Sequence, residues 1–142
     1  ALNIDFASTF LDVAGLPPSP EMQGRSMMPL LRGRVPADWR TSMYYRYYHD
    51  PGDHNTRAHY GVRTRTHKLI FFPTKQQWEL FDLVNDPYEL HNLYGAPGLG
   101  PLTASLTAEL VRLKEAVRDD DQFANDQFPN GVDGTVARLR GK

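Results

Sequence analysis

The 142-residue sequence contains no cysteine, no long hydrophobic run and no excess of either charge. Without cysteine, disulfides cannot stabilise the fold, and thiol content gives no indication of the compartment, which stays open. No apolar run approaches the length of a membrane-spanning helix. The 16 basic and 17 acidic residues leave a net charge of −1, which favours neither nucleic acid nor an anionic membrane surface as a partner.

The first ten residues, ALNIDFASTF, also lack the basic start and long apolar stretch of a signal peptide, and they enter a helical pattern at once. Because a natural protein rarely starts inside an element, we expect the chain to be a fragment of a longer one. Its 40% hydrophobic residues suffice for a modest core, and its length corresponds to one domain.

Alternating hydrophobicity and short connections predict an antiparallel meander in the centre of the chain. The expected strands span residues 58–64, 68–72 and 78–83. In the first of them, Tyr60 and Val62 point to one face of the sheet, while His59, Gly61 and Arg63 point to the other.

Elements on both sides of the meander complete the expected fold. A tyrosine-rich strand is expected at residues 41–48, helices at 3–14 and 26–33, and the clearest helix at 101–118. This last helix carries an apolar stripe of Leu102, Leu106, Leu110, Leu113 and Val117. The pattern predicts an α+β fold: a small antiparallel sheet of about four strands packed against a long C-terminal helix, with one or two shorter N-terminal helices.

Three stretches resemble sulfatases. WELFDLVNDPYELHNL resembles the family's C-terminal region, where a strand ending in E-L-[YF]-D-L runs into D-P-x-E-x-x-N-L. YGVRTRTHKLI resembles the family's G-V-R-T-x-x-Y-K-L-I strand pair, with His67 where an aromatic residue is usual. IDFASTFLDVAGLPPSPEMQGRSMMPLLRG resembles a preceding segment, although Ala7-Ser8-Thr9 replaces its proline-containing centre. The likeness covers roughly residues 3 to 118.

The resemblance implies a sulfuric ester hydrolase of the alkaline-phosphatase-like superfamily. Its nucleophile is a hydrated formylglycine made in a [CS]-x-P-x-R motif, and its divalent cation, usually calcium, is held by aspartates. None of these motifs is present in this chain. We therefore expect the chain to be inactive by itself, to hold no cofactor of its own, and to partner the catalytic domain of the same polypeptide, whose substrate is a sulfated small molecule or glycan.

The resemblance also suggests a division of the chain and a place for substrate contacts. Residues 1–33 form a helical junction with the catalytic domain, residues 34–118 the C-terminal subdomain, and residues 119–142 a polar tail. The predicted substrate-rim residues are His54, Arg57, His59 and Arg63, because arginine and histidine suit anionic sulfated sugars and glycine at 61 leaves room for another group. The alternative is that they form a solvent face or pair with acids of the catalytic domain.

Other interpretations remain open at this point. The chain could be a free-standing binding module for an anionic glycan or protein, or the equivalent part of a phosphonate monoester hydrolase-like enzyme. Asp119-Asp120-Asp121 could hold a metal, but a solvated acidic run is the better interpretation. Arg46 among tyrosines could bind nucleic acid, but a half-buried strand fits the net charge better.

The N-terminal helix is more apolar than a short helix on a small sheet requires. Ile4, Phe10 and Leu11, with Phe6 beside them, form its apolar stripe. We expect part of this surface to be buried against the catalytic domain. In the isolated chain we expect self-association, with a homodimer as the simplest form.

Overall fold

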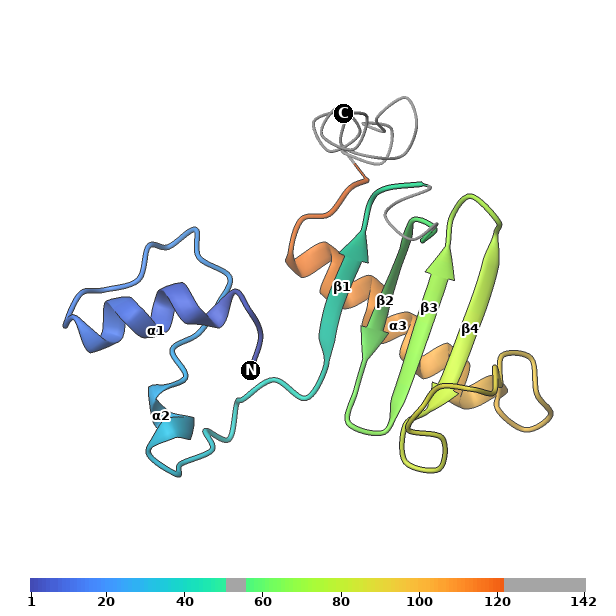
Figure 1. Ribbon diagram of the computed structural model, residues 1–142, viewed down its shortest axis with the longest axis horizontal. Helices are drawn as coiled ribbons and strands as arrows, with labels where there is room; N and C mark the ends of the chain where they lie inside the picture. The colour runs from blue at the N-terminus through green and yellow to red at the C-terminus, as the bar shows by residue number, and fades with distance from the viewer. Residues whose placement is uncertain (51–55, 122–142) are drawn as a thin grey trace, which may run out of the picture. The chain divides into compact units, whose positions relative to one another are not determined.

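The computed structural model describes residues 1–50 and 56–121, which form two compact units divided between Arg40 and Thr41 (Figure 1). Unit 1 contains helices α1 (Asp5–Val13) and α2 (Met28–Leu31). Unit 2 contains strands β1 (Met43–Tyr47), β2 (His59–Arg63), β3 (His67–Phe72) and β4 (Gln77–Asp82), followed by helix α3 (Gly100–Ala116). No helix within the described ranges has both the length and the apolar character needed to cross a bilayer.

The four strands of unit 2 form one antiparallel sheet in the order β1-β2-β3-β4, which confirms the predicted meander. The register places Val62 opposite Leu69, and Leu69 opposite Leu80, so the same face of three strands is apolar. The turn between β3 and β4 uses Gln76 at a φ of 52°, a left-handed conformation that a tight turn requires. Tight connections keep sequence neighbours adjacent in the sheet.

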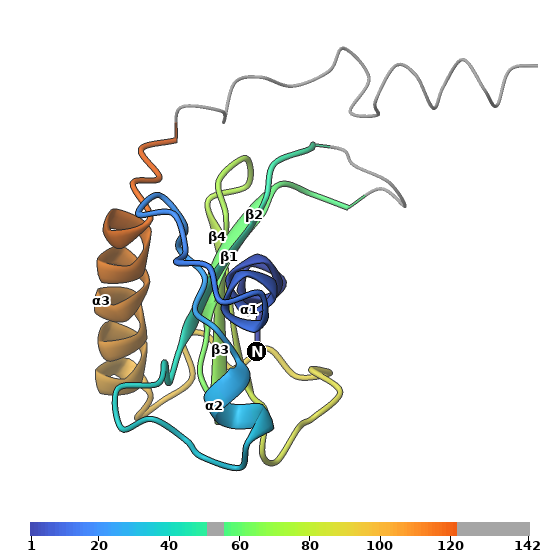
Figure 2. The same cartoon turned by 90° about the vertical axis from the view of Figure 1, so that its left-hand side faces the viewer.

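Helix α3 covers one face of this sheet, as Figure 2 shows. Its apolar stripe brings Leu106 and Leu110 against Val62, Leu69 and Leu80, and all five side chains are buried. The helix contributes residues four apart and the strands contribute alternate residues, so both periodicities meet in one core. This arrangement confirms the predicted α+β fold. The opposite face of the sheet, called the far face below, carries the alternate side chains of each strand.

The motif after β4 closes the free edge of that strand. The Leu80 N–H donates to the Asn92 side-chain oxygen (2.9 Å), the Asn92 side-chain N–H donates to the Trp78 carbonyl (3.2 Å), and the Leu93 N–H donates to the Leu80 carbonyl (2.8 Å). The Asn92 amide therefore takes the place of a neighbouring strand's peptide group. It satisfies backbone groups that an edge strand leaves unpaired and blocks further strand addition there.

Unit 1 has a polar interior built on Asp5, whose side chain is fully buried. Both carboxylate oxygens of Asp5 accept hydrogen bonds from Arg40, at 2.5 and 2.8 Å, and they also accept the N–H groups of Leu2 and Arg25. Burial by itself would raise the pKa of Asp5, but these donors outweigh it and lower the pKa to about 2. Thr9 extends the network, because its hydroxyl accepts the Met27 N–H at 2.9 Å.

The apolar stripe of α1 lies on the outer side of unit 1. Ile4, Phe6, Phe10 and Val13 are exposed, and Phe10 is 67% accessible. These four side chains therefore add little to the interior of unit 1, and the burial of the stripe against the catalytic domain stays a prediction. Because Asp5 and Thr9 are needed to organise the connecting loop, the polar side of the helix faces inwards and the aromatic side is left outside.

Candidate functional site

His59 lies on the far face within a group of aromatic side chains. Its ring stacks on Tyr47 with centroids 5.7 Å apart and an interplanar angle of 25°, and the rings of Tyr45 and Phe72 lie 5.8 and 5.4 Å away. Its Nδ1 atom is 2.7 Å from the Arg57 carbonyl oxygen. A carbonyl oxygen only accepts hydrogen bonds, so Nδ1 carries the proton, and the neutral ring has its lone pair on Nε2.

Arg57 is held at the start of β2 by a carboxylate. Its Nη1 atom donates to Asp50 Oδ1 at 2.9 Å, and the other oxygen of Asp50 accepts the Thr74 hydroxyl at 2.6 Å. Asp50 therefore joins the segment before β2 to the β3–β4 turn. A cavity of about 70 Å³ lies beside this contact, lined by His59 and Tyr48 among others.

Arg63 lies at the other end of β2 and belongs to a separate charged group. It faces Lys68 across the strand pair, and like charges in this position repel one another. Glu89 relieves the repulsion, because its carboxylate is 2.5 Å from Lys68 Nζ and 3.6 Å from Arg63 Nη1. Glu89 has a φ of 56°, so its backbone adopts a left-handed conformation at this contact.

The structure thus brings together two of the four predicted rim residues. Arg57 and His59 are adjacent, whereas Arg63 is four residues along the strand, about 13 Å from His59 at 3.3 Å per residue. His54 lies outside the described residues. Both arginines are paired with carboxylates of this chain. Among the described side chains, this pairing leaves Arg57 neutralised by Asp50, and it leaves Arg63 and Lys68 together with one positive charge beside Glu89.

The room that Gly61 leaves on the far face is filled from within the chain. Tyr45 lies opposite Gly61, and a Cβ added there would lie 2.8 Å from the Tyr45 hydroxyl oxygen and 2.5 Å from the Leu69 carbonyl oxygen. The Tyr45 hydroxyl is buried and has no hydrogen-bond partner among the described residues. Burial, followed by the charges of Glu89 and Glu79, raises the pKa of Tyr45. Gly61 is therefore explained by packing and not by a ligand.

The expectation of a solvated acidic run at residues 119–121 is wrong for Asp119. Its side chain is 8% exposed and accepts hydrogen bonds from Arg46, itself 7% exposed, at 2.7 and 2.8 Å. Tyr44 donates a short hydrogen bond to the same carboxylate, and Asp121 bridges Arg46 and Lys114. These five residues, named the Arg46 cluster, fix the end of α3 to β1.

The metal interpretation of the acidic run receives no support from this geometry. The Asp119 carboxylate is already saturated by a cation and a hydroxyl within the chain. Over residues 1–50 and 56–121, no group of three or more histidine, cysteine or acidic side chains is placed to hold a metal ion. The described residues therefore do not fit the divalent cation of sulfatases, and no chemical step is assigned to a metal in this chain.

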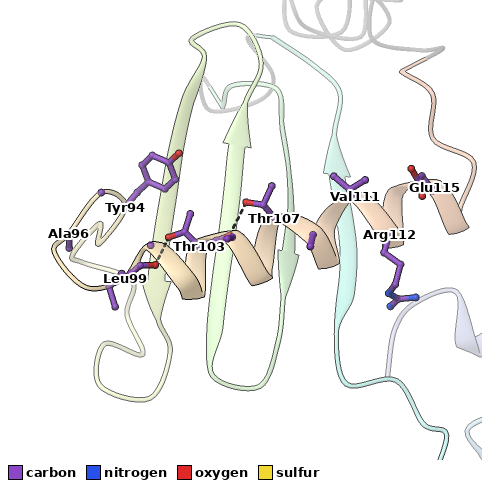
Figure 3. A pocket seen from close by; sticks show the side chains of 12 residues that line it. Tyr94, Ala96, Leu99, Thr103, Thr107, Val111, Arg112 and Glu115 are labelled. Atoms are coloured by element: carbon purple, nitrogen blue, oxygen red, sulfur yellow. Dashed lines mark hydrogen bonds between the residues drawn. The ribbon is translucent and has the colours of Figure 1, made fainter.

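The larger hollow of unit 2 lies on the outer side of α3, away from the predicted residues (Figure 3). It is an open groove of about 870 Å³ between the helix and the loop around Tyr94. Its two threonine hydroxyl groups are used inside the helix, because Thr103 donates to the Leu99 carbonyl at 2.9 Å and Thr107 donates to the Thr103 carbonyl at 2.8 Å. This groove offers shape but few free polar groups to a ligand.

Several functional partners escaped prediction from the sequence. Asp50 precedes a proline and Thr74 follows one, and such positions are typical of turns, with no sign of the contact between them. Glu89 belongs to the D-P-x-E pattern, which marked it without giving its contact. Asp50, Thr74 and Glu89 each contact a residue in another segment, from which at least one loop or turn separates them. Their partners could be found only after the sheet register was known.

Comparison with known proteins places this geometry in a family. Residues 1–116 match the family described as N-sulphoglucosamine sulphohydrolase, C-terminal. The chain is 39% identical over 124 residues to an N-acetylglucosamine-6-O-sulfatase of Bacteroides thetaiotaomicron. The aligned region covers 85% of this chain and 22% of that protein.

Solved structures agree with this match. A protein determined in complex with its substrate D-glucosamine-2-N,6-O-disulfate has a TM-score of 0.81 at 38% identity, over 85% of this chain and 25% of that chain. A phosphonate monoester hydrolase from Silicibacter pomeroyi shares the fold, with a TM-score of 0.68 at 24% identity over 82% of this chain and 25% of its own.

The chain spans about a quarter of the length of these relatives, and the part that matches is the same as the part that the sequence motifs indicated. The family match extends over most of the chain and includes both compact units. The chain therefore belongs to the sulfatase family, within the group of N-sulphoglucosamine sulphohydrolase C-terminal domains.

Proposed function

We propose that the chain is the C-terminal subdomain of a sulfuric ester hydrolase, in which it completes the fold and shapes the substrate cleft. The observation that carries the proposal is the match of residues 1–116 to a C-terminal sulfatase domain, in a chain without the [CS]-x-P-x-R motif. The formylglycine and the divalent cation then belong to a catalytic domain of the same polypeptide. A free-standing binding module is not favoured, because the relatives at 38–39% identity are about four times longer than the matching region.

The substrate of the whole enzyme is, on this proposal, a sulfated amino sugar. The relative at 39% identity is named for N-acetylglucosamine 6-O-sulfate, and the solved relative at 38% identity binds a disulfated glucosamine. Arg57 and His59, with His54 and Arg63, form the rim that contacts the sugar beyond its reacting sulfate. Partial exposure of both arginines supports this role, because their remaining N–H groups are available to a ligand.

We propose the following division within the subdomain. Residues 1–33 form the junction with the catalytic domain, and residues 34–118 form the subdomain proper. Residues 119–142 form the tail, of which Asp119 and Asp121 pair with Arg46 of β1 and residues 122–142 lie outside the described residues.

The first prediction concerns activity. The purified 142-residue chain should not release sulfate from an aryl sulfate or from N-acetylglucosamine 6-sulfate, with or without calcium, because it has no nucleophile motif. The polypeptide encoded by the complete reading frame should release sulfate from the sugar. Sulfate release can be followed by ion chromatography.

Two outcomes would contradict the proposal. One is turnover by the 142-residue chain above the buffer control, reproduced across preparations and inhibited by sulfate. The other is a complete reading frame without the [CS]-x-P-x-R motif, or one whose product cleaves a phosphonate monoester and no sulfate ester.

The second prediction concerns the exposed aromatic side of α1. In the whole enzyme we propose that it packs on the catalytic domain, and in the isolated chain that it mediates a homodimer. Light scattering across the micromolar range should show a dimer for the wild type and a monomer for Phe10→Glu. Val84→Glu, which charges an exposed apolar residue of unit 2, is the matched control and should remain dimeric. A monomeric wild type would remove the idea.

A further inference from the structure

We propose that Asp50 is a positioning residue for the substrate rim, because it holds the peptide group that fixes the ring of His59 and selects its tautomer. This inference rests on the proposed function, which places Arg57 and His59 in the rim. Asp50 itself is not a rim residue, because it acts through the backbone and through Arg57. It lies in the segment between β1 and β2, and its side chain is largely buried.

Asp50 contacts His59 indirectly, and the first link is its interaction with the peptide group between Arg57 and Ala58. The Arg57 guanidinium donates to the Asp50 carboxylate at 2.9 Å, and the Ala58 N–H points to the same carboxylate and makes a smaller contribution to lowering its pKa. The hydroxyl of Thr74 holds the other carboxylate oxygen at 2.6 Å, so the acceptor cannot rotate freely. The hydrogen bond from Thr74 is also the largest of the causes that lower the pKa of Asp50.

The second step passes through that peptide group to His59. A peptide is planar, and its N–H and C=O groups point in opposite directions. The N–H side of this peptide meets Asp50, and the carbonyl side meets His59 Nδ1 at 2.7 Å. A negative charge on the N–H side polarises the amide and makes its carbonyl a stronger acceptor. Asp50 therefore favours the His59 tautomer with the proton on Nδ1.

The third step is what this tautomer offers to a sugar. The neutral ring keeps its lone pair on Nε2, so His59 can accept a hydrogen bond from a hydroxyl group, whereas a sulfate oxygen has no proton to donate. Asp50 also neutralises Arg57. The Arg57–His59 end of the rim is therefore suited to sugar hydroxyls and not to a second sulfate. Stacking of the ring on Tyr47 keeps its plane fixed while it does so.

The experiment measures the tautomer first. Long-range proton–nitrogen NMR of the 142-residue chain, above the titration of its histidines, should show His59 with the proton on Nδ1. Asp50→Ala should shift His59 towards a mixture of tautomers, and the isosteric Asp50→Asn should do so with less disturbance. His67, whose Nδ1 contacts the Thr66 hydroxyl at 2.9 Å, reports whether the sheet is intact. Asp38→Asn removes a comparable but exposed arginine pair in unit 1 and should change neither ring.

The second arm uses the complete enzyme and two substrates. Asp50→Asn should raise KM for N-acetylglucosamine 6-sulfate about tenfold, the equivalent of one hydrogen bond, with little change in kcat. Hydrolysis of an aryl sulfate, which has no sugar hydroxyls, should be unaffected.

Three results would overturn the positioning role: an unchanged His59 tautomer in both Asp50 variants, an unchanged KM despite an altered tautomer, or equal losses on both substrates with a lower melting temperature. Failure of the wild-type enzyme to release sulfate would instead refute the proposed function, and the tautomer measurement would still decide whether Asp50 holds His59.

Discussion

Leu110→Ala is expected to lower the free energy of unfolding by about 2 to 5 kcal/mol. Leu110 is 2% exposed and lies in the cluster that joins α3 to Val62, Leu69 and Leu80. Truncation removes buried apolar area and leaves a cavity. The hydrogen bonds between the strands keep the sheet from moving in to fill that cavity. Urea denaturation followed by far-UV circular dichroism would measure the loss.

The next residue provides the control. Val111 is 49% exposed and lines the open groove along α3, so Val111→Ala should cost less than about 1 kcal/mol. Glu109, the residue before Leu110, is not a suitable control. Its carboxylate accepts hydrogen bonds from Ser42 and Arg112, so its replacement would remove both. Similar losses at Leu110 and Val111 would show that the helix does not bury the stripe that the structure assigns to it.

Arg46→Ala is the second variant with a large expected effect. It removes the cation that lies between Asp119 and Asp121, and Asp119 is then left buried with the Tyr44 hydroxyl and the Asp121 N–H as donors but with no cation. Breaking a buried ion pair from one side costs about 3 kcal/mol or more, because an uncompensated charge remains. We therefore expect a loss of this size in the free energy of unfolding, measured by urea denaturation at pH 7.

The loss should depend on pH in a defined direction. Burial by itself would raise the pKa of Asp119, but the hydrogen bonds from Arg46 and Tyr44 hold it below its ordinary value of 3.8. A carboxyl whose pKa is lowered by folding contributes stability above its unfolded pKa and loses that contribution as the pH falls through the folded value. The difference between wild type and Arg46→Ala should be full at neutral pH and shrink below about pH 4.

An exposed arginine of α3 serves as the comparison. Arg112 pairs with Glu109 three residues earlier, but its side chain is largely in water. Exposed pairs of this kind contribute little, so Arg112→Ala should leave the urea midpoint and its pH dependence nearly unchanged. A difference between Arg46→Ala and wild type that is the same at pH 2.5 and pH 7 would contradict the assignment of Asp119 as the buried partner.

In unit 2, local periodicity was sufficient to predict the strands and the helix and to predict which side of each is buried. Alternation placed Val62 inwards and His59 outwards on β2, and the spacing of four placed Leu106 and Leu110 on one stripe of α3. These predictions are correct because each depends on residues close in the chain, where the geometry of strand and helix decides which side chains share a face. Short connections then determined the order of the strands.

Periodicity located the apolar stripe of α1, but it gave no indication that the polar side of the helix would form the interior of unit 1. The buried side of α1 is set by the hydrogen bonds of Asp5 and Thr9 to a loop that lies about twenty residues further on. A buried carboxylate is stable only with such donors, so its partners decide the orientation of the helix. Hydrophobicity alone could not reveal this preference.

The sequence by itself determined the fold class, the sheet order and the sulfatase relationship, because all three depend on local patterns and on motifs in a set order. The tertiary structure alone decided the polar contacts of the candidate site. Asp50 meets Thr74 from 24 positions away, and Arg46 meets Asp119 from 73. Contacts at such separations depend on sheet register and helix docking. Until both are known, the sequence does not show which carboxylate pairs with which arginine or hydroxyl group.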